Sequence, residues 1–224
     1  MNALRLSAFV TLLSGLAPAQ IAVCAETGEH IANSGSAAGA PACISCHGAA
    51  GQGLGAAGFP RLAGLNADYL GSQLRGFQGG TRANPIMGPV AKLLSPADAK
   101  AVATYYAALP AVDPTGAAAA AGAAGAAGEM LATTGNWKIG VPACTQCHGV
   151  TGLGVGAAFP QIAGQSAVYL TNQLQAWKAG TRTNDPMGLM RGIAVKLSPT
   201  EVESVASYFA ALPSSHAGLA SGKP

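Results

Sequence analysis

Two short motifs of the same type carry the residues of this sequence that could do chemistry. Each has the form Cys-x-x-Cys-His, and the residues are Cys43, Cys46 and His47 in the first motif and Cys144, Cys147 and His148 in the second. Two thiols at this spacing can form thioether bonds with the two vinyl groups of one haem, and the adjacent histidine is then placed to bind the iron. The pattern therefore predicts two covalently bound haem c groups, with His47 and His148 as axial ligands.

Other uses of paired cysteines fit the spacing less well. A zinc ribbon places its two cysteine pairs about 15–20 residues apart, whereas Cys46 and Cys144 lie in separate halves of the chain. A thioredoxin-like site needs alternating strands and helices, and no long stretch alternates with a period of two. A disulfide across so short a gap is strained and needs no adjacent histidine. Haem attachment is the favoured interpretation.

Each iron also needs a sixth ligand or keeps an open face. Met87 and Met190 each lie eight residues before a Ser-Pro pair. Counted instead from the preceding Gly-Thr-Arg, Met187 is the counterpart of Met87, because the second half gains three residues in this region. A thioether ligand raises the reduction potential of haem iron, although a methionine beside a haem can also serve only as packing. We predict Met87 and Met190 as ligands, with Met187 as the alternative to Met190.

The two motifs belong to a tandem repeat. Phe59-Pro60, Tyr69-Leu70 and Gly80-Thr81-Arg82 all recur 100 residues later in the chain. A repeat of this length indicates a duplicated domain. We predict a signal peptide, a first domain, an Ala/Gly-rich linker, a second domain and a loosely ordered tail, at residues 1–25, 26–112, 113–128, 129–213 and 214–224.

Helical patterns occur at matching places in both halves. Leu70, Leu74 and Phe77 follow a helical period, and Ser95-Pro96 has the composition of a helix start. Together with their counterparts, these patterns predict helices over 27–34, 66–79, 95–109, 127–134, 166–180 and 198–212. The prediction is an all-α fold of two tandem domains, each built around its haem.

The N-terminal segment and the composition point to export. Residues 6–16 are apolar but too few to cross a bilayer, which takes roughly 20. Val23-Cys24-Ala25 supplies small residues for cleavage after Ala25, whereas an uncleaved anchor and a lipid on Cys24 are the alternatives. The 12 Lys and Arg residues form no basic stripe, which argues against nucleic-acid binding. Membrane association is compatible with the sequence but not implied by it.

Several further residues are candidates for the surroundings of the haems. The aromatic candidates, for haem contact or plain core packing, are Tyr69, Phe77, Tyr105, Tyr169, Trp177 and Tyr208. Arg82 and Arg182 either face haem propionates as charge-assisted donors or are ordinary surface cations. His30 and His216 are expected at the surface.

The repeated boxes Cys-x-x-Cys-His-Gly, Phe-Pro-x-[Leu/Ile]-Ala-Gly, Tyr-Leu-x-x-Gln-Leu and Gly-Thr-Arg-x-Asn, with the methionine and the final Leu-Ser-Pro, resemble those of the diheme cytochrome c4 family. The resemblance covers residues 26–213. It implies crossing N- and C-terminal helices beside each haem, His/Met ligation at both irons, and Met190 as the second methionine. It also implies that the carbonyls of Pro60 and Pro160 accept hydrogen bonds from the two iron-bound histidines.

Together, these features predict a periplasmic electron carrier, not an enzyme. It would transfer single electrons from a respiratory donor, such as a cytochrome bc complex or a dehydrogenase, to a terminal oxidase or reductase. The alternative is a diheme subunit of a periplasmic dehydrogenase that oxidises sulfide or an alcohol. A peroxidase or gas-binding protein would require one iron to lose its methionine, and both repeats keep one.

Overall fold

The computed structural model describes residues 26–112 and 125–215, and all regular elements in these ranges are helices. Outside α- and 3-10 helices, the same ranges contain only isolated β-bridges. The predicted all-α fold is confirmed. The predicted signal peptide, most of the linker and His216 lie outside the described residues. None of the helices in these two ranges is long and apolar enough to span a bilayer.

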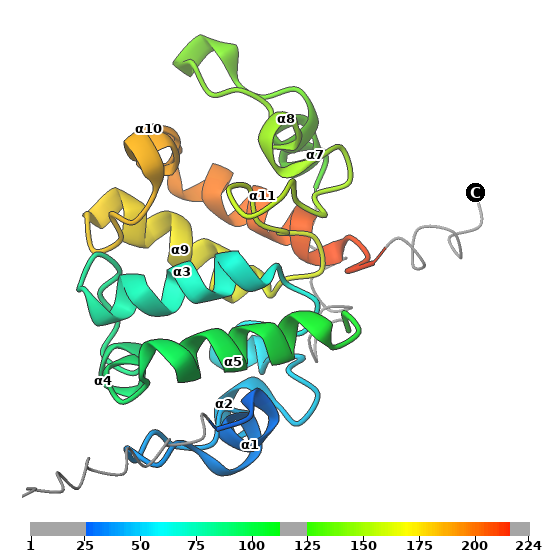
Figure 1. The fold of residues 1–224 in the computed structure, drawn as a ribbon. Coiled ribbons are helices and arrows are strands. Elements are labelled where there is room, and N and C mark those ends of the chain that lie inside the picture. Colours follow the sequence, from blue (N-terminus) through cyan, green and yellow to red (C-terminus); the bar gives the residue numbers. More distant parts are fainter. Residues whose placement is uncertain (1–25, 113–124, 216–224) are drawn as a thin grey trace, which may run out of the picture.

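The two halves have the same order of elements (Figure 1). The first half contains α1 (Gly28–Ser34), α2 (Ile44–His47), η1 (Gly55–Ala57), α3 (Ala67–Gln78), α4 (Met87–Lys92) and α5 (Pro96–Ala108). The second contains α7 (Ala126–Thr133), η2 (Trp137–Ile139), α8 (Thr145–His148), α9 (Ala167–Ala179), η3 (Pro186–Gly188), α10 (Leu189–Ala194) and α11 (Pro199–Ala211). All six predicted helices are present, whereas α2, α4, α8 and α10 were not predicted.

The first and last helices of each half pack closely against each other. A methyl group at Gly28 would lie 2.1 Å from the carbonyl oxygen of Ala101, and one at Gly128 would lie 2.3 Å from that of Ser204. Only glycine allows the backbones of α1 and α5, or of α7 and α11, to approach this closely. This packing forms one wall beside each Cys-x-x-Cys-His motif.

Capping explains where α5 and α11 begin. The hydroxyl of Ser95 accepts a hydrogen bond from the backbone N–H of Asp98, whose carboxylate accepts one from the backbone N–H of Ser95. Ser198 and Glu201 repeat this arrangement at the start of α11. Two otherwise unsatisfied backbone donors are thereby paired at each helix start.

Each half has its own core. Ile31, Leu70, Leu94, Val102 and Tyr106 are buried in the first. The core of the second contains Leu131, Val141, Leu197, Val202, Val205 and Phe209. The chain is therefore two domains, with α3 and α9 facing each other between them and α1 and α7 at opposite ends (Figure 1).

The two domains are joined by polar contacts between backbone groups and between side chains. The backbone N–H of Ala83 donates to the carbonyl of Thr181 at 2.8 Å, and that of Thr183 donates to the carbonyl of Thr81 at 2.7 Å. Arg82 and Arg182, which lie in this pairing, are only 6% and 4% exposed. The interpretation of these arginines as surface cations is therefore wrong.

A second contact anchors the domains beside the first haem motif. The side-chain amide of Gln165 accepts from the backbone N–H of Arg61 at 2.9 Å and donates to the carbonyl of Arg61 at 3.1 Å. The guanidinium of Arg61 in turn donates to the carbonyl of Ala163 at 3.2 Å. Because Arg61 follows Pro60, this contact also holds the chain segment that reaches the proximal histidine.

Candidate haem-binding sites

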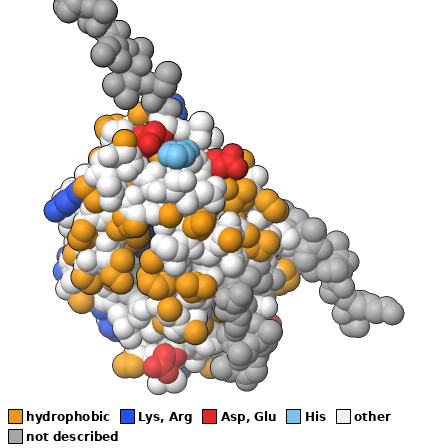
Figure 2. All heavy atoms as spheres, turned by 90° about the horizontal axis from the view of Figure 1, so that it is seen from below, with side chains coloured by type: hydrophobic (Ala, Val, Ile, Leu, Met, Phe, Trp, Pro, Cys, Tyr) orange, Lys and Arg blue, Asp and Glu red, His pale blue; other side chains and the backbone are white. Residues whose placement is uncertain are grey.

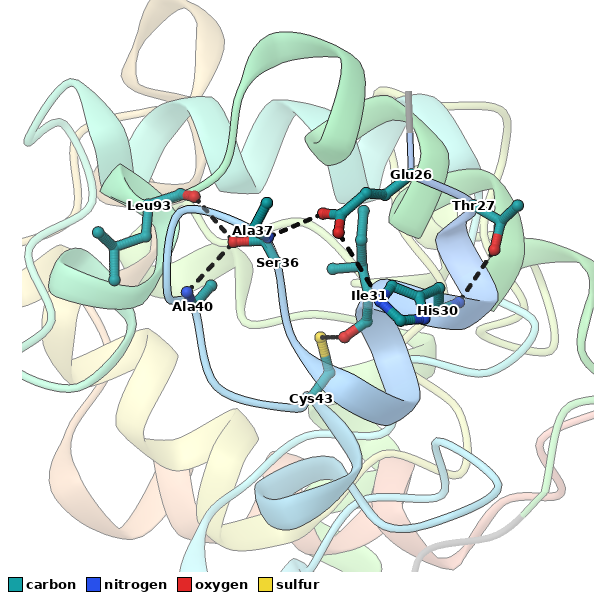
Figure 3. Close-up of polar contacts among 9 residues, drawn as sticks. All are labelled: Glu26, Thr27, His30, Ile31, Ser36, Ala37, Ala40, Cys43 and Leu93. Carbon is teal, nitrogen blue, oxygen red and sulfur yellow. Dashed lines mark hydrogen bonds and ion pairs between the residues drawn. The ribbon is translucent and has the colours of Figure 1, made fainter. Parts of the chain in front are cut away.

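The first motif lies on the short helix α2, against the end of α1. Cys43 and Cys46 are free, half-buried thiols. The Sγ atom of Cys43 lies 3.9 Å from the carbonyl oxygen of Ile31 on α1 (Figure 3). His30, on the same helix, is exposed and pairs with Glu26 at 3.7 Å, so it is a surface residue (Figure 3). The thiol is therefore held at the inner side of α1.

His47 is the buried centre of this site. Its side chain is 5% exposed, and its Nδ1 atom lies 2.9 Å from the carbonyl oxygen of Pro60. Its Nε2 atom is buried and has no hydrogen-bond partner. Burial lowers the pKa of His47, so the ring is neutral at neutral pH. With Nδ1–H donating to Pro60, a neutral ring presents the Nε2 lone pair, which is the form that binds a metal.

A cavity of about 610 Å³ adjoins His47 and both thiols of the first motif. This volume lies within the roughly 300–1,000 Å³ typical of ligand sites. Leu70 and Tyr106 supply part of its wall, and Tyr169 and Gln173 of the second domain complete it. A group that bonds to two thiols, ligates one neutral imidazole and fills an apolar space fits this site, and haem c has these properties.

The second motif repeats the arrangement. His148 is buried, and its Nδ1 atom lies 2.7 Å from the carbonyl oxygen of Pro160. Burial lowers the pKa of His148 and raises that of Cys144 to about 11. Cys147, like Cys144, is a free and half-buried thiol. Both domains thus present a neutral imidazole beside two free thiols.

The candidate sixth ligands lie in different surroundings. Met87 is the first residue of α4, is half-buried and lines the cavity next to His47. Met190 is half-buried within α10. Met187 lies in the preceding 3-10 turn, with a positive φ of 57° and a side chain that is 92% exposed. Its side chain therefore lies outside the core of the second domain.

Among the aromatic candidates of the first domain, two line the cavity, whereas the position predicted for Tyr105 is held by the next residue in the sequence. Tyr69 and Phe77 line the cavity of the first domain, but Tyr105 does not. Tyr106, which is 2% exposed, occupies that place, and Phe209 is the buried counterpart in the second domain. The helical spacing from Val102 to Tyr106 was the signal in the sequence that identifies the buried position.

Sequence reasoning missed the polar network between the domains. Gln73 of α3 and Gln173 of α9 both hydrogen-bond to the two buried arginines. Their recurrence at matching repeat positions was the available signal, because a polar residue repeated at an equivalent place on both central helices suggests a shared contact.

Comparisons with known proteins agree with this geometry. The sequence model of the cytochrome c family matches residues 32–109 and 126–213. A thiosulfate dehydrogenase electron acceptor of Thiomonas intermedia is 49% identical over 82% of this chain and 84% of the relative. A similar acceptor of Stutzerimonas stutzeri is 47% identical over 88% of this chain and 93% of the relative. A cytochrome c4 of Pseudomonas aeruginosa is 36% identical over 95% of this chain and the whole of the relative.

Two solved structures also have a fold similar to that of this chain. The thiosulfate dehydrogenase TsdBA from Marichromatium purpuratum matches with a TM-score of 0.74 and 44% identity over 84% of this chain, which spans only 40% of that protein. Reduced cytochrome c4 from Pseudomonas stutzeri matches with a TM-score of 0.67 and 34% identity, over 76% of this chain and 93% of that protein.

Proposed function

The chain belongs to the cytochrome c family as a tandem protein with two covalently bound haem c groups, and from this premise we propose that it accepts single electrons from a thiosulfate-oxidising dehydrogenase. It is an electron carrier and not an enzyme. In the proposed scheme it works in the periplasm, after removal of the predicted signal peptide, and passes its electrons to a terminal oxidase or reductase.

The observation that carries the proposed role is the pair of equivalent buried sites. Each has a histidine whose Nδ1 is fixed by a proline carbonyl, at 2.9 Å from Pro60 and 2.7 Å from Pro160. In the proposed scheme, Met87 and Met190 complete the two iron sites. An iron with two protein ligands has no open position for substrate, so the sites suit electron transfer.

The division of work among the residues follows from this geometry. When bound, haem supplies an iron that changes between ferric and ferrous states by one electron. The cysteines tether the ring, and the carbonyls of Pro60 and Pro160 hold the imidazoles in one orientation and tautomer. Leu70 and Tyr106 exclude water from the first site. A thioether ligand then favours the ferrous state, as an acceptor of electrons requires.

The choice of donor rests on the relatives. Those described as thiosulfate dehydrogenase electron acceptors are 49% and 47% identical to this chain, against 34–38% for those described as cytochrome c4. The surface does not suggest strong electrostatic steering, since the face over α1 and α2 carries few charged side chains among many apolar ones (Figure 2). A dehydrogenase that forms a largely uncharged contact suits this surface.

Rapid mixing of the oxidised protein with a purified thiosulfate dehydrogenase and thiosulfate tests the proposal. We expect both haems to become reduced, with two electrons taken up per chain. Thiosulfate without the dehydrogenase, and the dehydrogenase without thiosulfate, are the controls. If only a cytochrome bc complex with quinol reduces the protein, the proposed donor is wrong while the electron-carrier function stands.

A further inference from the structure

We propose that Gln165, in the second domain, is a positioning residue for the haem of the first domain. It hydrogen-bonds to the peptide group that orients His47, and it thereby strengthens the bond between that peptide and the imidazole ring. The inference requires His47 to bind iron, as the proposed function does. It does not depend on which protein donates the electrons, so the donor and this role of Gln165 can fail separately.

One peptide group joins Gln165 to His47. The carbonyl of Pro60 and the N–H of Arg61 belong to the same planar peptide unit. The carbonyl oxygen lies 2.9 Å from Nδ1 of His47, and the N–H donates to the side-chain oxygen of Gln165 at 2.9 Å. A continuous chain of two hydrogen bonds therefore runs from the imidazole of the first domain to a side chain of the second.

The peptide is also held in place from two sides. The side chain of Gln165 donates to the carbonyl of Arg61 at 3.1 Å, so one amide binds both backbone polar groups of that residue. On the other side, the N–H of Leu62 donates at 2.8 Å to the carbonyl of Gly51, in the loop that follows His47. Gln165 and Arg61 are 2% and 0% exposed, so water does not compete for these bonds. The orientation of the peptide therefore depends on the amide of Gln165.

The same bond cannot form at the second haem motif. The residue of the first domain that corresponds to Gln165 is Leu65, whose side chain has no hydrogen-bonding group. Leu65 is buried in the core of its own domain. At the equivalent place of the interface, Asn66 of the first domain and Gln161 of the second line a cavity of about 270 Å³. Leu65 therefore does not act on the peptide that holds His148.

The peptide transmits an electronic effect as well as an orientation. Linked hydrogen bonds polarise one another, and each gains roughly 10–30% in strength. When the N–H of Arg61 donates to Gln165, the carbonyl of Pro60 becomes a stronger acceptor. A stronger acceptor at Nδ1–H makes the imidazole of His47 a more basic ligand. Because a more basic ligand stabilises ferric iron, Gln165 should lower the reduction potential of the first-domain haem.

The test is a redox titration of the holoprotein, combined with NMR of its reduced form, for the wild type and Gln165→Met. Methionine has a side chain of similar length but removes both hydrogen bonds to Arg61. Sequential assignment of the isotope-labelled protein identifies the ring signals of both proximal histidines and links each haem to its domain. Ser166→Ala is the matched control, because Ser166 is 4% exposed and its hydroxyl donates to a different carbonyl across the same interface, that of Gly55, at 2.9 Å.

We expect Gln165→Met to increase the ferrous-to-ferric ratio of the first-domain haem at a fixed potential by roughly threefold. This is an upward shift of about 30 mV, at about 59 mV per tenfold change for one electron. The second-domain haem should change little. The Nδ1–H proton signal of His47 should move upfield, because its hydrogen bond weakens, whereas that of His148 should stay in place. Gln165→Glu keeps an acceptor for the N–H of Arg61, so it should not raise the potential.

The proposal is overturned if the first-domain potential does not rise in Gln165→Met, if both haems shift equally, or if Ser166→Ala reproduces the shift. A rise in Gln165→Glu equal to that in Gln165→Met would also overturn it. An unchanged His47 signal in Gln165→Met would contradict it as well, because the proposed effect acts through that bond. Haem content per chain, measured on each sample, separates these results from failed haem attachment.

Discussion

Replacing Met190 by alanine should open one of the two irons, whereas replacing Met187 should leave both closed. Met190 is half-buried on α10, in the position that matches Met87 when the repeats are aligned from their last helices. The side chain of Met187 is 92% exposed. Because Met187 lies in an exposed turn before α10 and not on that helix, we expect its loss to leave the ligands of the iron unchanged.

The expected magnitudes differ sharply between the two variants. Reduced Met190→Ala should bind carbon monoxide at one haem of two, which is half of the total haem, and reduced Met187→Ala at none. Truncating a buried methionine costs roughly 2–5 kcal/mol. For the half-buried Met190 we expect about half of that from packing alone, and for Met187 a change within about 0.5 kcal/mol.

The assay is the optical difference spectrum of the reduced protein with and without carbon monoxide, set against the haem content of the same sample. The wild type should show no change, and a Met87→Ala/Met190→Ala double variant should bind carbon monoxide at both haems. If Met187→Ala opens an iron and Met190→Ala does not, the assignment of the second ligand is refuted. If the wild type itself binds carbon monoxide, the sites are not both closed.

Two further predictions concern the frame that holds the second site. In Gly128→Ala, the new methyl group would lie 2.3 Å from a carbonyl oxygen of α11, so the helices must separate by about 1 Å. Overpacking of this kind costs roughly 1–3 kcal/mol and should lower the thermal midpoint of the second domain, whereas Gly192→Ala, with open space around it, should not. In Glu201→Gln, the charge that interacts with the start of α11 is lost, at a cost of roughly 0.3–1 kcal/mol. Hydrogen bonds from Ser198 and Asn136 lower the pKa of Glu201 in the folded protein. The stabilisation is therefore fully present above the ordinary pKa of a glutamate carboxyl group. It is lost as the pH falls through the lowered pKa of Glu201. Urea unfolding at several pH values should show the wild type and the variant converging in acid, and a constant difference would contradict this reasoning.

The sequence predicted the long helices because their signals are local. Ser95-Pro96 and Ser198-Pro199 set helix starts through capping, and these contacts involve residues at most three positions apart. The residues that immediately precede the short helices α4 and α10 make no side-chain cap hydrogen bond; Asn84 and Asp185, further back in the chain, accept from first-turn N–H groups instead. Six residues are too few to be stable alone, so tertiary packing forms these helices, and no local pattern announces them.

The ambiguity over the second methionine has a structural explanation. The second half gains three residues after Arg182, and the extra turn η3 lies in this stretch, with Met187 in a left-handed conformation. The chain has absorbed the insertion there before α10 begins. Counting forward from Arg182 therefore leads to a residue in the added turn, and counting back from Ser198 leads to the half-buried position of Met190.

The polar interface was missed because its residues, taken one repeat at a time, resemble surface residues. Arginine and glutamine are mostly exposed in proteins, and only the fold shows that Arg82 and Arg182 are buried. Their burial depends on contacts between residues about 90–110 positions apart. Nothing in either repeat alone specifies that pairing.

The same interface fixes the orientation of the two haem-binding domains. Backbone hydrogen bonds at 2.8 Å and 2.7 Å and the Gln165 contact orient one domain against the other. The spacing of the haems is then set by α3 and α9, whatever the composition of the linker. The paired positions are not identical, however, because Trp177 corresponds to Phe77, and Gln165 corresponds to Leu65. Because the polar groups of the two sites differ, we expect the two haems to have different reduction potentials, so that an electron entering the molecule has a preferred site.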